Sequence, residues 1–256
     1  MPILTLEAVT KEYDSIRALD CVSMKVEKGT IKGLMGPNGA GKSTLFHLIS
    51  GVERPDSGRI SFRGREITAL DAHEISALGM ARTFQTVQTL GNMTVVENVL
   101  AGMHLRLKGG LISSGLWLPW IKRTEAEALK EAKEILDSLG LLGRWKSPAS
   151  QLPLGKQKLL ELGRAIAMRP ELVLLDEPAS GLTPAEAGQL SERICQFKKN
   201  GITFFIVEHQ MGMVMEIADE VVILDNGRVI AEGPPHAIEG DSRIIEVYMK
   251  DRGINA

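Results

Sequence analysis

Alternating apolar and polar residues dominate the first sixty positions of the chain. Residues 4–8 and 22–26 place an apolar side chain at every second position, which predicts strands with one buried face. A third alternating segment covers residues 58–62. Between these segments, the continuous apolar run 31–35 leads into a glycine-rich loop and then an apolar-periodic run. We therefore expect hairpin-like strands combined with a strand–loop–helix unit.

The second half of the chain alternates helical patterns with strands. A helix is expected from Lys156 to Met168, ending before Pro170. Asn226-Gly227 predicts a tight hairpin turn. Three continuous apolar runs predict central parallel strands buried on both faces: 172–175, 202–207 and 221–224. Helices alternating with such strands predict an α/β fold with a central, mostly parallel sheet and an antiparallel β subdomain.

The middle of the chain is mostly helical in pattern. Residues 101–123 read as an irregular insertion or as short helices, since glycines and Pro119 interrupt an apolar stretch that contains two tryptophans. Thr124 and Glu127 fit a capping box, which predicts that an amphipathic helix starts there and ends at Gly140. We expect one domain, 1–256, with about 1–89 and 166–256 as its core and about 90–165 as a helical subdomain.

Composition and charge narrow the possible partners. The chain has 256 residues, of which 44% are hydrophobic and 24% charged, and its net charge is −2. This balance gives no electrostatic reason to expect a nucleic-acid partner. No apolar segment approaches the roughly 20 residues that span a bilayer. Any membrane role is therefore expected to act through a partner.

A phosphate-binding pattern follows the apolar run 31–35. The segment fits G-x-x-x-x-G-K-[ST], in which glycines let backbone N–H groups surround phosphate oxygens. The helix N-terminus adds partial positive charge. Lys42 is expected to reach the β- and γ-phosphates, and Ser43 to ligate Mg²⁺. The predicted nucleotide-binding loop comprises Gly36, Pro37, Asn38, Gly39, Ala40, Gly41, Lys42, Ser43 and Thr44.

An acidic pair ends the strand predicted at 172–175. The carboxyl ends of strands are where open α/β sheets bind ligands. We expect Asp176 to hold Mg²⁺ and Glu177 to orient and activate the attacking water. The alternative is an acidic pair that starts a helix before Pro178.

Other candidates are weaker when taken alone. His209 follows the strand 202–207 and can touch a γ-phosphate, or it can be a structural hydrogen-bonding residue. Gln85 can be a solvated glutamine and Tyr13 a half-buried tyrosine. The segment 152–157 can bind an anion or can simply start the next helix.

The order of these pieces resembles the ATP-binding subunit of an ABC transporter across essentially the whole chain. The resemblance implies the P-loop ABC ATPase fold, with ATP and Mg²⁺ bound. It implies that Tyr13 stacks on adenine, that Gln85 contacts Mg²⁺ and signals to the permease, and that His209 is the switch histidine. Glu177 resembles the catalytic glutamate. The segment Leu152, Pro153, Leu154, Gly155, Lys156 and Gln157 takes the place of the signature, which contacts ATP on the opposite subunit.

A closer resemblance is to the branched-chain amino acid permease subfamily. Uptake systems for urea, amides and aromatic compounds share the same sequence pattern, so the substrate stays open. The closer resemblance rests on 81–85, 93–99, the insertion 101–123 and Glu208-His209. The long insertion is similar to that of the G-type ATPase subunit. The implied partners are a second ABC ATPase subunit, two membrane permease subunits and an extracytoplasmic substrate-binding protein. The implied place is the cytoplasmic face of the cell membrane, held by the permease.

Two positions depart from the family pattern. Pro153 stands where the signature L-S-G-G-Q has serine, which removes a hydroxyl expected to touch the γ-phosphate across the dimer. A hydrogen bond to a charged group contributes about 1.5–3 kcal/mol, so we expect weaker dimer closure. Thr183 replaces an aspartate, which the subfamily often lacks.

Three other functions stay open at this point. An exporter ATPase for lipid or polysaccharide has the same ATP site. A soluble ABC protein of DNA repair or translation usually carries long coiled coils or two cassettes, whereas this chain has one phosphate loop. A non-catalytic partner in a heterodimer is suggested by Pro153. The insertion 101–123 is expected to contact the permease, and the alternative is ordinary packing within the helical subdomain.

Overall fold

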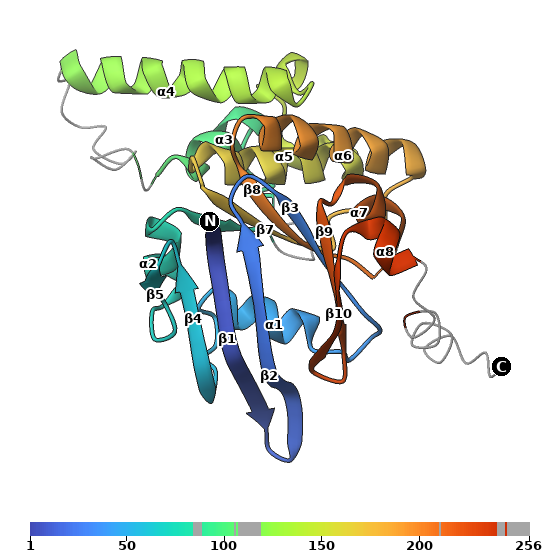
Figure 1. Cartoon of the computed structure of the whole chain (residues 1–256). Helices are drawn as coiled ribbons and strands as arrows, with labels where there is room; N and C mark the ends of the chain where they lie inside the picture. Colours follow the sequence, from blue (N-terminus) through green and yellow to red (C-terminus); the bar gives the residue numbers. More distant parts are fainter. Residues whose placement is uncertain (84–88, 105, 107–118, 210, 240–243, 245–256) are drawn as a thin grey trace. The chain divides into compact units, whose positions relative to one another are not determined.

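A computed structural model of the chain describes residues 1–83, 89–104, 106, 119–209, 211–239 and 244 (Figure 1). The chain divides into two compact units. Unit 1 comprises 1–82, 171–179 and 194–256, and unit 2 comprises 83–170 and 180–193. The subdomain boundaries expected from the sequence, 1–89, 90–165 and 166–256, stay predictions.

An antiparallel sheet in unit 1 has the strand order β2-β1-β4-β5. Its strands are β1 (Pro2–Tyr13), β2 (Ile16–Glu27), β4 (Ser57–Phe62) and β5 (Arg65–Glu66). Leu4 and Leu6 of β1 face Val26 and Met24 of β2, and all four side chains are buried. The alternating pattern of the first sixty residues therefore produces a sheet with one apolar face, as expected.

The second sheet of unit 1 is mostly parallel and has the order β10-β9-β3-β8-β7-β6. Its parallel strands are β3 (Ile31–Met35), β6 (Met80–Arg82), β7 (Leu172–Asp176), β8 (Thr203–Val207) and β9 (Glu220–Asp225). Strand β10 (Arg228–Gly233) pairs antiparallel with β9. Every residue of β7 and β8 is buried, as are residues 221–224 of β9, which confirms the prediction from the three continuous apolar runs. Every residue of β3 is buried as well.

One apolar core in unit 1 contains residues from both sheets and from α1 (Lys42–Ile49). Phe46 of α1 packs against Phe205 of β8 with ring centroids 5.1 Å apart. This packing fixes the helix that follows the phosphate loop. The other helices wholly within unit 1 are α2 (Ala72–Ala77), α7 (Met211–Ile217) and α8 (Pro235–Glu239).

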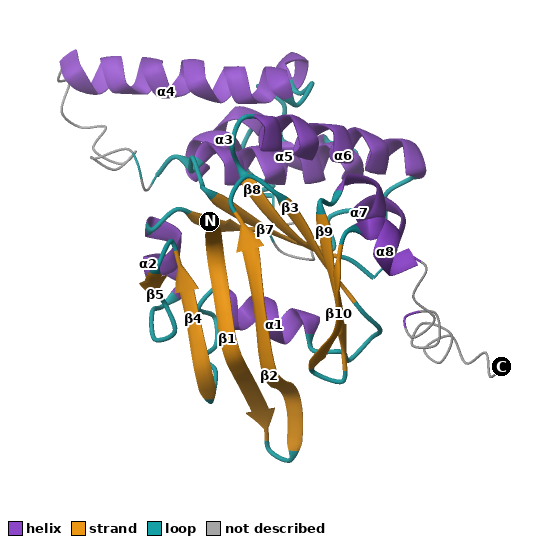
Figure 2. Ribbon diagram, viewed as in Figure 1, coloured by secondary structure: helices purple, strands orange, loops and turns teal. Residues whose placement is uncertain are grey.

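Helices build unit 2, and every named strand lies in unit 1 (Figure 2). Unit 2 contains α3 (Val95–Gly102), α4 (Pro119–Ser138), α5 (Leu154–Ala167) and two short 3₁₀ turns, Leu142–Arg144 and Ala149–Gln151. A capping box formed by Thr94 and Glu97 starts α3. Helix α6 (Pro184–Lys199) begins in unit 2, and its residues from 194 onward belong to unit 1.

The predicted start of α4 is wrong. The helix begins at Pro119 rather than at Thr124, so Thr124 lies inside the helix and does not cap it. Proline is favoured in the first turn, where its missing N–H has no intrahelical acceptor to lose. Most of the insertion 101–123 lies outside the described residues. Within the described part of the chain, no helix is long and apolar enough to cross a membrane.

Candidate functional site

The phosphate loop joins the end of β3 to the start of α1, as the sequence predicts. Gly41 precedes the helix with φ 101°, a conformation that side-chain-bearing residues seldom adopt. A Cβ at Gly36 would lie 2.0 Å from the carbonyl oxygen of Leu224 on β9. The glycines therefore permit both the turn and the close approach of two backbones.

Lys42 is held inside the loop. The residue is 7% exposed, and its Nζ donates to the carbonyl oxygens of Gly36 at 2.7 Å and Pro37 at 2.8 Å. The ammonium group and the N–H groups at the start of α1 together favour an anion at this end of the helix.

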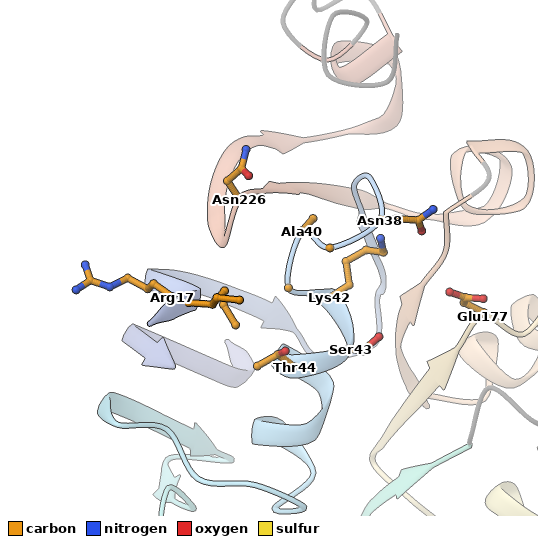
Figure 3. A pocket seen from close by; sticks show the side chains of 12 residues that line it. Arg17, Asn38, Ala40, Lys42, Ser43, Thr44, Glu177 and Asn226 are labelled. Carbon is orange, nitrogen blue, oxygen red and sulfur yellow. The ribbon is translucent and has the colours of Figure 1, made fainter. Parts of the chain in front are cut away.

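A pocket of about 340 Å³ opens over the loop (Figure 3). Figure 3 shows Glu177 on the side of the loop that carries Lys42 and Ser43, with Arg17 and Asn226 on the opposite side. The residues that line it are Ile16, Arg17, Ala18, Asn38, Gly39, Ala40, Gly41, Lys42, Ser43, Thr44, Glu177 and Asn226.

The residues of the pocket fit a nucleotide phosphate chain with Mg²⁺. A Cβ at Gly39 would have no atom within 4 Å, so there is open space directly above the loop. Ser43 is exposed into the pocket. A hydroxyl oxygen beside phosphate oxygens is the kind of ligand set that Mg²⁺ prefers.

Asp176 ends β7 and is 7% exposed. Its Oδ2 is 3.1 Å from Nη2 of Arg82, which ends the neighbouring strand β6. Arg82 also donates to the Ser50 hydroxyl at 2.7 Å. The carboxylate expected to hold Mg²⁺ is therefore ion-paired in this structure, through an arginine that the sequence reasoning did not single out.

Glu177 follows β7 with φ 46°, an unusual backbone angle for a residue with a side chain. Its Oε2 is 3.6 Å from Nδ1 of His209, which follows β8. The parallel pairing of β7 with β8 explains this contact, because both strands end at the same edge of the sheet. The structure thus brings together Lys42, Ser43, Glu177 and the strand end that carries His209.

Tyr13 lies at the end of β1 and is not among the residues that line the pocket. Its hydroxyl donates to Oε2 of Glu53, while Oε1 of Glu53 is 3.1 Å from Nδ1 of His47. Burial, followed by the bond to Glu53, raises the pKa of Tyr13. Stacking of Tyr13 on adenine stays a prediction. Gln85 lies outside the described residues.

The signature segment lies at the start of α5 in unit 2. Pro153 is the residue that caps the helix, and Leu154 is exposed. A Cβ at Gly155 would lie 2.6 Å from Oε1 of Glu186, so a carboxylate lies against the N-terminus of this helix. Hydrogen bonds from Thr183, and then one from the Gly155 N–H, lower the pKa of Glu186.

The other signature residues have mixed environments. Leu152 is buried, Lys156 is exposed, and the Gln157 side-chain amide donates to the Leu152 carbonyl at 2.7 Å. This bond spans the turn at Pro153, whose side chain has no hydroxyl to cap the helix. Contact of this segment with ATP on a second subunit stays a prediction.

The sequence reasoning missed several residues that line the pocket. Ile16, Arg17 and Ala18 begin β2, and Asn226 forms the turn between β9 and β10. The sequence predicts a turn at Asn226-Gly227, but it does not indicate that this turn lies beside the phosphate loop. The Gly227 N–H donates to the Ala40 carbonyl at 3.0 Å, which ties this hairpin to the phosphate loop.

A protein-family model described as "ABC transporter" matches residues 19–180 of the chain. The chain belongs to the ABC transporter family. This ABC transporter chain is 40% identical over 252 residues to the "Probable branched-chain amino acid transport ATP-binding protein LivG" of Archaeoglobus fulgidus, covering 97% of this chain and 96% of the relative. It is 35% identical over 249 residues to the "High-affinity branched-chain amino acid transport ATP-binding protein LivG" of Escherichia coli, covering 97% and 98%.

Solved structures agree with this ABC transporter membership. A crystal structure of the ADP conformation of an ATP-binding cassette from an ABC transporter has a TM-score of 0.86 and 36% identity, covering 97% of this chain and 99% of that chain. A nucleotide-free ATP-binding cassette from an ABC transporter has a TM-score of 0.84 and 35% identity, covering 97% and 99%. The predicted fold and the predicted family are confirmed, and the chain is an ATPase cassette of this family.

Proposed function

We propose that this chain hydrolyses ATP to energise the import of branched-chain amino acids or related small amides. The observation that carries the proposal is the shared pocket of the phosphate loop and Glu177, with His209 3.6 Å from that carboxylate. The names of the relatives support the substrate class, because they are near full-length matches.

The pocket residues divide the work of phosphoryl transfer. Lys42 and the loop N–H groups hold the phosphate chain of ATP and stabilise charge that develops on it. Glu177 accepts a hydrogen bond from the attacking water and orients it toward the γ-phosphate. His209 lies beside Glu177 and contacts the same region of the substrate.

Mg²⁺ is the proposed metal of this site, and Ser43 with Asp176 would hold it. The ion would neutralise charge on the β- and γ-phosphate oxygens. Asp176 would hold the ion through water, since its carboxylate already pairs with Arg82.

The assembly that we propose has a second ATPase subunit, two permease subunits and an extracytoplasmic binding protein. Tyr13 and Gln85 would contact nucleotide or Mg²⁺, and residues 152–157 would contact ATP bound to the second subunit. The chain would lie at the cytoplasmic face of the membrane, held by the permease. A solved structure 26% identical to this chain is described as part of an ABC transporter complex, which supports such an assembly.

The test is uptake of labelled leucine in cells whose own copy of this chain is replaced by Glu177→Gln. The amide cannot act as the base, so we expect ATP turnover of the purified transporter to fall by about 10² to 10⁴. ATP binding is expected to persist, because the phosphate loop is intact. Leucine uptake is expected to be lost.

Glu7→Gln is the matched control, since Glu7 is exposed on β1 and does not line the pocket. Normal turnover by Glu177→Gln would refute the assignment of the base. Lost turnover with normal leucine uptake, accompanied by altered envelope lipid, would instead point to export.

A further inference from the structure

The segment that carries Glu177 is held in an unusual backbone conformation. Glu177 has φ 46°, and the next residue, Pro178, has no N–H to donate. A left-handed residue with a side chain persists only where the surrounding structure fixes it. The position of the Glu177 carboxylate therefore depends on how the residues on either side of Pro178 are anchored.

Both anchors come from consecutive residues at the end of β8. The Glu177 N–H donates to the Val207 carbonyl oxygen at 2.9 Å. The Ala179 N–H donates to Oε1 of Glu208, also at 2.9 Å. These two bonds use both of the backbone N–H groups that residues 177–179 possess, so the second depends on one side chain.

Glu208 is itself fixed. Glu208 is 2% exposed, and its own N–H donates to the Leu34 carbonyl on β3 at 3.2 Å. A carboxylate is seldom buried to this extent unless hydrogen bonds compensate for the lost water. The bond from Ala179 is charge-assisted and hence stronger than one between neutral groups.

The next residue, His209, approaches the Glu177 side chain at 3.6 Å. The two neighbouring residues therefore contact different parts of the segment. Glu208 binds its backbone at Ala179, and His209 lies beside the Glu177 carboxylate. We propose that Glu208 is a positioning residue for Glu177, which acts by holding the backbone after Pro178. This inference rests on the proposed role of Glu177 as the residue that activates water.

The test uses two variants of the full chain in its assembled transporter, which separate the effect of the length of the Glu208 side chain from the effect of its charge. Glu208→Gln keeps an oxygen at the same distance from Ala179 but removes the charge, whereas Glu208→Asp keeps the charge and shortens the reach. A displacement near 1 Å can lower a rate by about 10²-fold, so we expect kcat for ATP to fall about 10- to 100-fold in Glu208→Asp. Glu208→Gln is expected to lose about threefold or less, with KM little changed in both variants.

Thr203→Val is the matched control. The Thr203 hydroxyl also accepts from a backbone N–H, that of Gly29 at 3.0 Å, but at the opposite end of β8. Its loss tests the general effect of removing such a bond from this strand, and we expect kcat to stay within about twofold of the wild type.

Three outcomes would overturn the proposal: wild-type kcat in Glu208→Asp, a larger loss in Glu208→Gln than in Glu208→Asp, or an equal loss of kcat in Thr203→Val. Glu177→Gln measured in the same assay keeps the two proposals apart. If Glu177→Gln is as active as the wild type, the proposed catalytic role fails. If it is inactive and Glu208→Asp is normal, only the positioning role fails.

Discussion

At the scale of single residues, the site depends on buried charges that are paired. Arg82 and Asp176 have side chains that are 9% and 8% exposed, and each stands at the end of its own strand. The sequence does not indicate that these two residues pair, since 94 positions separate them. Their ion pair fixes the carboxylate that we assign to Mg²⁺.

We expect Arg82→Met to lower the free energy of unfolding by about 3–5 kcal/mol, because it leaves the Asp176 carboxylate buried without its cation. Arg82→Met combined with Asp176→Asn is expected to recover part of this loss. Chemical denaturation of these two variants and of Asp176→Asn alone measures both effects. Additive losses in the double variant would show that the two side chains do not interact.

At the scale of elements, the phosphate loop is shaped by its neighbours as much as by its own glycines. The carbonyl of Leu224 on β9 contacts the position of Gly36, and the Gly227 N–H of the β9–β10 turn bonds to Ala40. Gly39, at the open side of the loop, has no such neighbour. The loop is therefore tightly packed on one side and accessible on the other.

This difference predicts unequal effects of the same substitution. Gly39→Ala meets only backbone strain at φ 78°, about 1–2 kcal/mol. Gly36→Ala also forces a Cβ into Leu224, so we expect a further loss of about 1–3 kcal/mol in the free energy of unfolding. Thermal denaturation of the two variants compares them, and equal midpoints would argue against the close packing of β9 on the loop.

At the scale of the whole molecule, the two units are each assembled from separated stretches of chain. Long-range ion pairs therefore matter within each unit. In unit 2, Glu131 of α4 accepts from Arg106 at 2.8 and 3.0 Å and from Arg169 at 3.0 Å with each of its two oxygens. The bonds from Arg106, and then those from Arg169, lower the pKa of Glu131.

This shift predicts a loss of stability in acid. An unfolded glutamate has a pKa of about 4.3, and the pKa of Glu131 in the folded chain is lower. The contribution of Glu131 to the free energy of unfolding is therefore complete above the unfolded pKa, and it disappears as pH falls through the folded pKa. We expect the wild type to be more stable than Glu131→Gln at pH 7, with the difference shrinking toward pH 3. Unfolding free energies measured across this range provide the test, and a gap independent of pH would contradict it.

The sequence by itself determined the phosphate loop, the buried strands β3, β7 and β8, and the acidic pair after β7. Each of these depends on residues that are neighbours in the chain, where spacing and periodicity are sufficient evidence. The start of α4 was missed because two local signals competed, a capping box at Thr124 and a proline at 119. Only the tertiary structure decided that Arg82, Asn226 and Glu208 join the site. Their partners are brought near by the pairing of distant strands, and no local pattern specifies which strand ends will meet.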